Sequence, residues 1–149
     1  MPVRYVAGDL FANRHNVAAF GHGCNCRGVM GSGIAAQFKK HYPAMFEAYR
    51  DMCKANPREF NPGDAFLWQA DDAPDVFNLA TQDGYGGFRP AKLEWVMAAL
   101  QEMRQQADEV GIMSIAIPAI GSGLGGLRWD NVRATIDAEF TDWEGVLVV

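Results

Sequence analysis

The chain has 149 residues, of which 49% are hydrophobic, and a formal net charge of −5 at pH 7. A chain of this length buries roughly 68–70% of the surface of its unfolded form, so a core forms without disulfide or metal support. Three cysteines, an odd number, argue against a disulfide framework, and no apolar run is long enough to span a membrane. We therefore expect one domain over 1–149, a cytoplasmic monomer without a targeting or membrane segment, and neither a cofactor nor a metal ion.

The first half of the chain alternates short strands with helices. Val3–Val6 is predicted to be the first strand and Val17–Gly21 the second. A glycine-rich stretch over 28–33 leads into a predicted helix at Ile34–Tyr42, which stops there because a residue before a proline avoids helical backbone angles. Pro43 then suits the first turn of a further helix.

The second half continues this alternation. Its clearest element is a helix from Pro90, with apolar residues at helical spacing, that Gly111 ends. The other predicted elements are strands at Ala65–Trp68, Val76–Ala80, Ser114–Pro118 and Gly145–Val149 and a helix at Asn131–Phe140. Strands that alternate with helices indicate an α/β fold with a mixed or mostly parallel sheet between helical layers. Ligands of such sheets bind beyond the carboxyl ends of the strands.

The most informative stretch is the glycine loop at 121–126, which follows a predicted strand and precedes a predicted helix. Glycine lets a ligand approach the backbone closely, and a helix N-terminus attracts anions. The pattern therefore predicts a phosphate-binding loop, and residues 28–33 predict a second one. The loop at 121–126 also contains the pattern G-x-G-x-x-G. This pattern does not indicate a dinucleotide fold, because such a fold needs the loop in its first βαβ unit and here the loop lies in the last quarter of the chain. A purely structural glycine turn is the alternative.

The segment from His22 to Cys26 contains a histidine and two cysteines. C-x-C spacing does not suit a tetrahedral zinc ion, so we expect structural cysteines, with a cysteine nucleophile beside His22 as an open alternative. Because histidine titrates near neutral pH, His22 is the best local candidate for an acid or base. The alternative is a histidine that is hydrogen-bonded within the fold. Asp83 and Tyr85 are weaker candidates.

Charge is unevenly distributed along the chain. Residues 1–60 carry eight Lys and Arg against four acids, whereas residues 61–149 carry five against fourteen. The cations concentrate in predicted helical segments, at Lys39, Lys40, Arg50, Lys54 and Arg58. A solvated helix face is the ordinary explanation, and a surface for nucleic acid or another polyanion is the alternative.

Three stretches in order resemble the macrodomain family: Gly8-Asp9-Leu10, the run from His22 to Ala35, and the run from Ile117 to Trp129. The likeness spans nearly the whole chain. Residues 25–42 look most like the branch that contains terminal ADP-ribose protein glycohydrolase and the macrodomain antitoxins that remove ADP-ribose from DNA. The run around His22 also resembles the yeast ADP-ribose 1″-phosphate phosphatase. The resemblance implies a three-layer α/β/α fold with a cleft for ADP-ribose.

The resemblance also implies a role for each site residue. Asp9 would accept the adenine amine, although its local sequence equally suits a turn or cap aspartate, and Leu10 would frame the ring. Asn25 would hydrogen-bond the distal ribose and, with His22, form the catalytic pair. Amides for the two phosphates and the distal ribose would come from Gly31, Ser32, Gly33 and Ile34 and from Gly121, Ser122, Gly123, Leu124 and Gly125.

Two departures from the glycohydrolase branch concern catalysis. Gln82 stands where the branch has a lysine, and Gly125 or Gly126 stands where it has an aspartate. We therefore expect hydrolysis of an ADP-ribose derivative without the lysine-dependent mechanism. The derivative would be an ADP-ribosyl group on protein or nucleic acid, or ADP-ribose 1″-phosphate. A non-catalytic ADP-ribose reader is the alternative.

Overall fold

The computed structural model describes residues 2–84, 90–121 and 126–149. Six strands form one sheet in the order β1-β6-β5-β2-β4-β3. Their bounds are β1 Val3–Arg4, β2 Ala19–Cys24, β3 Ala65–Trp68, β4 Asp75–Ala80, β5 Ser114–Ala116 and β6 Val146–Val148. All paired strands run parallel except β3 and β4, which are antiparallel. The sheet is therefore mixed, as predicted.

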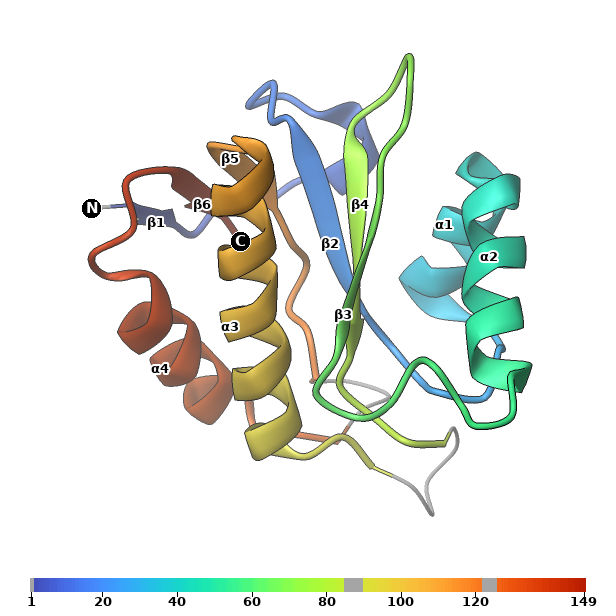
Figure 1. Cartoon of the computed structure of the whole chain (residues 1–149). Helices are drawn as coiled ribbons and strands as arrows, with labels where there is room; N and C mark the ends of the chain where they lie inside the picture. Colours follow the sequence, from blue (N-terminus) through green and yellow to red (C-terminus); the bar gives the residue numbers. More distant parts are fainter. Residues whose placement is uncertain (1, 85–89, 122–125) are drawn as a thin grey trace.

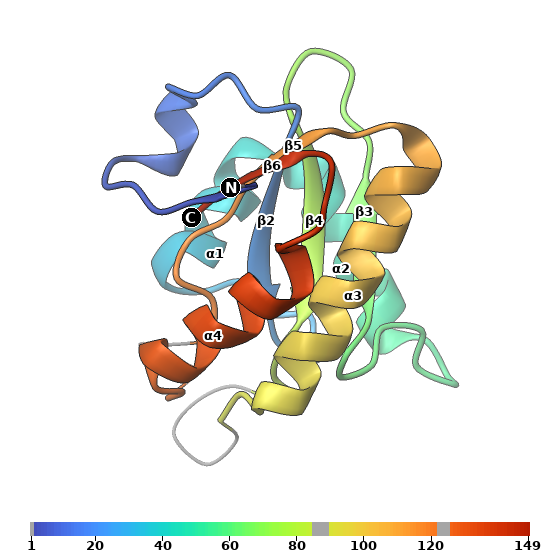
Figure 2. The same ribbon diagram turned by 90° about the vertical axis from the view of Figure 1, so that its left-hand side faces the viewer.

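Helices cover both faces of this sheet. α1 (Gly33–His41) and α2 (Pro43–Lys54) lie on one face, and α3 (Leu93–Val110) and α4 (Trp129–Phe140) lie on the other (Figures 1 and 2). The predicted three-layer α/β/α arrangement is thus confirmed. Of the helices within the described residues, none has both the length and the apolar character that crossing a bilayer requires.

The core consists of two hydrophobic clusters, one on each side of the sheet. The cluster under α3 and α4 contains fully buried aliphatic side chains, among them Leu100, Met103 and Ile115. The cluster under α1 and α2 is rich in aromatic rings and includes Phe38 and Tyr49. Burial of these side chains fixes the strand ends from which the loops of the candidate site emerge.

Most element boundaries agree with the sequence-based prediction to within a few residues. α3 begins at Leu93 instead of Pro90, and α4 begins at Trp129 instead of Asn131. β2 differs at both ends, because it spans Ala19–Cys24 instead of the predicted Val17–Gly21. A short 3₁₀ helix after β1, η1 (Leu10–Ala12), was not predicted.

Candidate functional site

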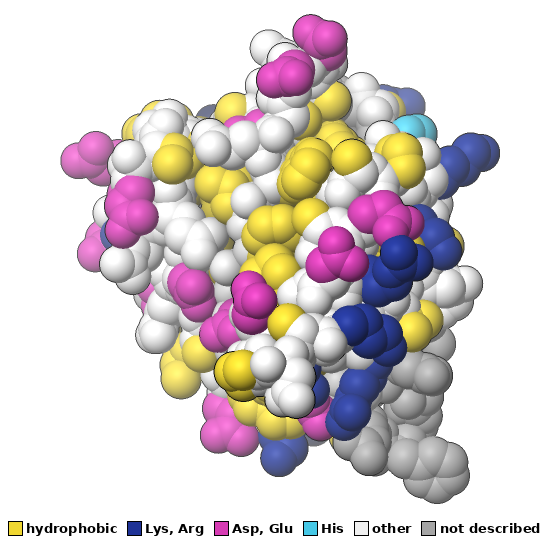
Figure 3. All heavy atoms as spheres, turned by 45° about the vertical axis from the view of Figure 1, so that its right-hand side comes forward, with side chains coloured by type: hydrophobic (Ala, Val, Ile, Leu, Met, Phe, Trp, Pro, Cys, Tyr) yellow, Lys and Arg dark blue, Asp and Glu magenta, His cyan; other side chains and the backbone are white. Residues whose placement is uncertain are grey.

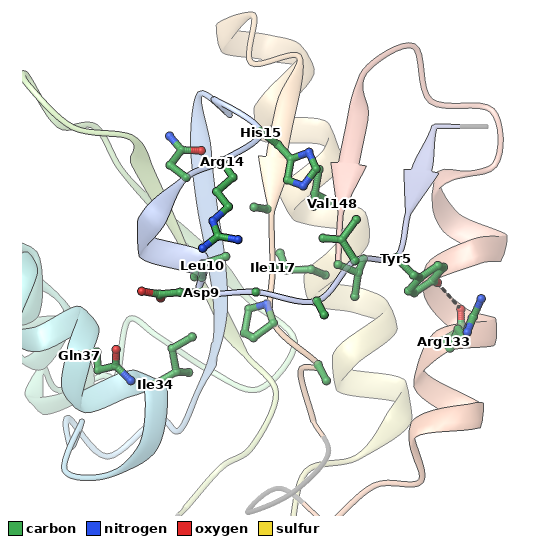
Figure 4. Close-up of a pocket in the computed structure, with 18 of the residues that line it drawn as sticks. Tyr5, Asp9, Leu10, Arg14, His15, Ile34, Gln37, Ile117, Arg133 and Val148 are labelled. Atoms are coloured by element: carbon green, nitrogen blue, oxygen red, sulfur yellow. Dashed lines mark hydrogen bonds between the residues drawn. The ribbon is translucent and has the colours of Figure 1, made fainter.

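A cleft of about 700 Å³ lies beyond the carboxyl ends of β1, β5 and β6. Its lining includes residues that follow or end these strands, namely Ile117, Pro118 and Val148. Figure 4 shows Ile117 and Val148 in the cleft. Its position is the one expected for the ligand of a largely parallel α/β sheet. Its volume lies within the range of small-molecule sites, about 300–1,000 Å³.

One wall of the cleft contains Asp9 and Leu10, which follow β1. Asp9 caps η1, because its Oδ1 accepts a hydrogen bond from the backbone N–H of Phe11 at 3.1 Å. The cap orients the carboxylate, and Figure 4 shows it on the side of the cleft nearest to Ile34 and Gln37. Within the cleft lining that the structure describes, Asp9 is the one carboxylate. Both alternatives raised for Asp9 are thus compatible, since it caps a helix and also faces the cleft.

The N-terminus of α1 lies at the same wall. Ile34 and Gln37 of this helix line the cleft, and Ser32 is the N-cap residue. The Ser32 side chain makes no capping hydrogen bond, so the first amides of α1 are not satisfied by it. Gly33 has a φ of +60°, a backbone angle that glycine adopts freely and that other residues adopt only with strain. An uncapped helix N-terminus at a cleft is an anion-binding arrangement.

The opposite wall is built by α4 and the residue after β1. The Arg133 guanidinium carbon lies 3.9 Å from the centroid of the Tyr5 ring, and Trp129 meets the same ring edge-on at 6.2 Å. The Tyr5 hydroxyl donates a hydrogen bond to Asp137 Oδ1 at 2.6 Å. Burial, followed by this bond, raises the pKa of Tyr5 above its usual value. Tyr5, Trp129 and Arg133 therefore give this end of the cleft an aromatic and cationic wall.

Sequence reasoning did not identify several residues that line the cleft, namely Tyr5, Asn13, Arg14, His15, Gln37 and Arg133. Tyr5 and Asp137 are 132 residues apart in the chain, and no short motif connects them. The i, i+4 spacing of Trp129 and Arg133 could have indicated a shared helix face.

The predicted phosphate loop at 121–126 is described only at its two ends. Gly121 and Gly126 have φ values of +73° and +79°. The backbone N–H of Leu127 donates to the Gly121 carbonyl at 2.9 Å, which closes the loop. A Cβ at Gly121 would lie 3.0 Å from Leu127 Cδ1, so the close contact and the positive φ both favour glycine there. The remaining predicted contacts, Ser122, Gly123, Leu124 and Gly125, lie outside the described residues, as does Tyr85.

Asn25 lies in the loop after β2 and is held by several hydrogen bonds. Its Nδ2 donates to the Val29 carbonyl at 2.8 Å, and its Oδ1 accepts from the Arg27 backbone N–H at 2.9 Å. The Tyr49 hydroxyl lies 2.9 Å from the same Oδ1 and 2.8 Å from the Asn25 carbonyl oxygen. A side-chain amide has two N–H donors, so one remains for a ligand. Asn25, Gly31, Ser32, Gly33 and Gly121 are not among the residues that line the described cleft, whereas Asp9, Leu10 and Ile34 are.

His22 has the environment of the alternative raised for it, a histidine that is hydrogen-bonded within the fold. Its ring is fully buried, stacks on Phe38 at 3.9 Å between centroids, and places Nε2 2.7 Å from Asn78 Oδ1. Burial lowers the pKa of His22 from 6.5 to about 4, against the opposing effect of its bond to Asn78. The ring is therefore neutral at neutral pH and does not reach the cleft. The acid–base role predicted for His22 does not fit this position, because a buried ring cannot contact a substrate.

Asp83 is a paired anion. Its carboxylate lies 2.9 Å from Arg58 Nη1 and 3.1 Å from Arg27 Nη2, and its carbonyl accepts from the Cys26 N–H at 3.0 Å. Burial by itself raises the pKa of Asp83, but the two arginines outweigh it and hold the pKa below its usual value. The group thus ties the loop after β4 to the loop after β2 and is a poor proton donor.

The three cysteines are all free and buried. Burial raises the pKa of the Cys26 thiol to about 12, with smaller effects from neighbouring charges, and also raises the pKa of Cys24 and Cys53. Protonated, buried thiols are poor nucleophiles. Among the described residues no group of three or more His, Cys, Asp or Glu is arranged to hold a metal ion.

Comparison with known proteins identifies the family. The Macro domain pattern matches residues 22–136 of this chain, which is more than half of its length. The chain belongs to the macrodomain family. The fold agrees, since the macrodomain of Mycobacterium tuberculosis DarG superimposes with a TM-score of 0.86 at 34% identity, covering 99% of this chain and 95% of that one.

Two kinds of name recur among the curated relatives of this macrodomain. The DNA ADP-ribosyl glycohydrolase of Mycobacterium tuberculosis is 36% identical over 141 residues, which cover 93% of this chain and 38% of the relative. The ADP-ribose 1″-phosphate phosphatase of Lodderomyces elongisporus is 29% identical over 92% of each chain. This macrodomain therefore spans about two fifths of the length of the glycohydrolases that it matches, and nearly the full length of the phosphatases.

Proposed function

We propose that this macrodomain binds ADP-ribose in its cleft and hydrolyses the bond between C1″ of the distal ribose and an attached group. The observation that carries the proposal is the placement, on one wall of the cleft, of the Asp9 carboxylate beside the uncapped N-terminus of α1. An adenine amine needs an acceptor, and a diphosphate needs backbone amides, and the cleft offers both. The names of the relatives support the same chemistry.

The ligand would lie across the cleft in one direction. Asp9 accepts the adenine amine, Leu10 and Ile34 contact the ring, and the α1 amides bind one phosphate. The loop at 121–126 binds the other phosphate, in keeping with the positive φ at both of its described ends. The free N–H of Asn25 donates to a hydroxyl of the distal ribose.

Hydrolysis forms a bond between a water oxygen and C1″ and breaks the bond from C1″ to the attached group. The water loses a proton, and the departing group gains one. Gln82 supplies no amine for a Schiff base, so we propose a route without lysine in which a phosphate of the substrate orients the water. Asn25 contributes by fixing the distal ribose, since its own position is fixed by Tyr49 and the Arg27 backbone.

Gln82 also favours a second candidate function, a reader that binds ADP-ribose without turnover. In that case the cleft would keep its affinity for ADP-ribose and consume no substrate. The identity of the attached group is a further question, because protein, nucleic acid and the 1″-phosphate are all consistent with a cleft that recognises ADP-ribose itself.

We further propose that the protein is cytoplasmic, which the three free cysteines support, and that it is a monomer.

Titration calorimetry with ADP-ribose tests the binding, and Asp9→Asn is the informative variant. Asparagine caps a helix as well as aspartate does, so η1 is preserved while the charged acceptor is lost. Loss of a hydrogen bond to a charged group is expected to weaken binding about tenfold or more. Affinity unchanged in this variant would remove Asp9 from the adenine site.

Turnover is tested separately. The protein is incubated in excess with ADP-ribose 1″-phosphate, ADP-ribosylated protein and ADP-ribosylated DNA, and the release of ADP-ribose or phosphate is followed. Consumption of at least one substrate supports the hydrolase. Tight binding of ADP-ribose with no substrate consumed identifies the reader.

A further inference from the structure

A line of exposed cations runs along α1 and α2. Lys39 Nζ lies 4.4 Å from the centroid of the Phe46 ring, and the Arg50 guanidinium carbon lies 5.8 Å from the same centroid. Lys54 follows one helical turn after Arg50, and all three cations are exposed. Figure 3 shows Lys and Arg side chains gathered in a column on this side of the molecule. Lys39, Arg50 and Lys54 form what is here named the basic stripe.

The stripe has the opposite sign to the rest of the protein. Residues 25–60 carry six Lys and Arg against three acids, in a chain of net charge −5. Of the acids on α2, Glu47 pairs with Arg50, and Asp51 is exposed. Lys39 and Lys54 form no ion pair with any residue that the structure describes. The surface therefore has unneutralised positive charge that suits a polyanion.

The stripe directly adjoins the loop that carries Asn25. Gly28 of this loop has a φ of +80°, and a Cβ placed there would lie 3.2 Å from Arg50 Cγ and 3.3 Å from Lys54 Cε. The stems of these two cations therefore pack on the backbone of the loop. The positive φ and the short distances both favour glycine at this position.

We propose that the basic stripe binds the sugar–phosphate backbone of a polynucleotide whose ADP-ribosyl group occupies the cleft. The inference rests on the proposed function, because it takes Asn25 as the contact of the distal ribose. A macromolecule joined to C1″ leaves the cleft beside this loop, where Arg50 and Lys54 lie. The attached group of the substrate is then nucleic acid.

The surroundings of the stripe favour a polynucleotide over other polyanions. Among the described residues the exposed large hydrophobic side chains are Val6, Val29, Met97, Val110 and Met113, and only Val29 lies in the loop beside the stripe. A protein interface has an apolar centre, and a helix that lies in a membrane surface needs exposed apolar residues. A linear chain of phosphates needs neither, and its binding is dominated by released counterions.

The test uses the whole chain and a fluorescently labelled, unmodified single-stranded oligodeoxynucleotide, with affinity measured by anisotropy over a range of salt concentrations. The stripe variant combines Lys39→Gln, Arg50→Gln and Lys54→Gln. The control combines Arg4→Gln, Gln101→Glu and Gln105→Glu, which change the net charge equally at exposed positions on β1 and α3. Loss of three phosphate contacts is expected to reduce the salt slope by about 2 and to weaken binding about tenfold at moderate salt. The control is expected to change neither by a comparable amount.

Two further measurements make the outcome decisive. Calorimetry with ADP-ribose is expected to give the same affinity for the wild type and the stripe variant, whereas turnover of an ADP-ribosylated oligonucleotide is expected to fall in the stripe variant alone. Equal oligonucleotide binding by the stripe variant and the control overturns the proposal, and so does equally tight binding of polyglutamate by the wild type. Absence of ADP-ribose binding instead contradicts the proposed function, which the oligonucleotide titration does not address.

Discussion

The two sides of the sheet differ in what they bury. The side under α3 and α4 is packed mainly with aliphatic side chains and places few polar groups inside. The side under α1 and α2 buries aromatic rings together with His22 and Asn78, and connects them to the loops through Tyr49. The first arrangement mainly stabilises the fold and reaches the cleft at Ile117 and Trp129. The second uses buried hydrogen bonds to set the positions of the loops after β2 and β4.

This difference shows how non-directional and directional contacts have separate roles in this macrodomain. Aliphatic burial is non-directional, so it holds α3 and α4 on the sheet without specifying any loop conformation. Hydrogen bonds are directional, and a buried partner that loses its bond costs free energy, so such bonds specify one conformation. The loop that carries Asn25 is accordingly fixed by hydrogen bonds from its own side chain and from Tyr49.

A substitution on the aliphatic side of the sheet is expected to cost the most stability. Leu100→Ala removes a fully buried side chain of α3 and leaves a cavity. Such substitutions lower the free energy of unfolding by about 2–5 kcal/mol. Urea denaturation measures this loss, and calorimetry below the unfolding transition is expected to show unchanged affinity for ADP-ribose. A large loss of affinity would contradict the separation of the two sides.

The buried histidine gives the second effect, which depends on pH. Because the pKa of His22 is about 4 in the folded protein and 6.5 ordinarily, the unfolded chain takes up a proton first as the pH falls. Its contribution to stability is therefore complete above pH 6.5 and is lost between pH 6.5 and 4, by about 3 kcal/mol in total. Urea denaturation across this pH range is expected to show that the free energy of unfolding falls less with decreasing pH in His22→Gln than in the wild type.

The control for this prediction is the exposed His15, since His15→Gln is expected to keep the wild-type pH dependence. His22→Gln is also expected to retain turnover of whichever substrate the wild type consumes, measured at a temperature where the variant is folded. An abolished turnover in a folded His22→Gln protein would restore His22 to the mechanism.

The position of His22 also shows where the sequence was sufficient and where it was not. The order of strands and helices followed from hydrophobic spacing, and Pro43 and Gly111 marked helix ends correctly. β2 spans Ala19–Cys24 instead of the predicted Val17–Gly21, so both Gly21 and Gly23 lie within the strand. A Cβ at Gly21 would lie 2.9 Å from Ile117, and one at Gly23 would lie 2.8 Å from Thr81 Oγ1. These glycines have close neighbours among the residues that directly follow β5 and β4, which local sequence does not reveal.

The candidate site was predictable to the extent that its residues lie in short motifs. Asp9, Leu10 and Ile34 do line one cleft. The cleft wall formed by Tyr5 and Arg133 depends on contacts between the residue after β1 and α4, and no local pattern encodes such a pairing. The pairing of Asp83 with Arg27 and Arg58 is likewise a product of the fold.

Two tyrosine substitutions with small effects on stability compare a hydrogen bond that positions the site with one that only stabilises the fold. Tyr49→Phe removes the hydroxyl that bonds Asn25, and Tyr42→Phe removes one that donates to the Pro74 carbonyl at 2.9 Å. Each loss is expected to cost about 1 kcal/mol of unfolding free energy. Only Tyr49→Phe is expected to lower turnover, because Pro74 lies before β4 and away from the Asn25 loop. Unfolding and turnover measured on both variants give the comparison, and equal turnover in the two would show that Asn25 does not need Tyr49 to hold the distal ribose.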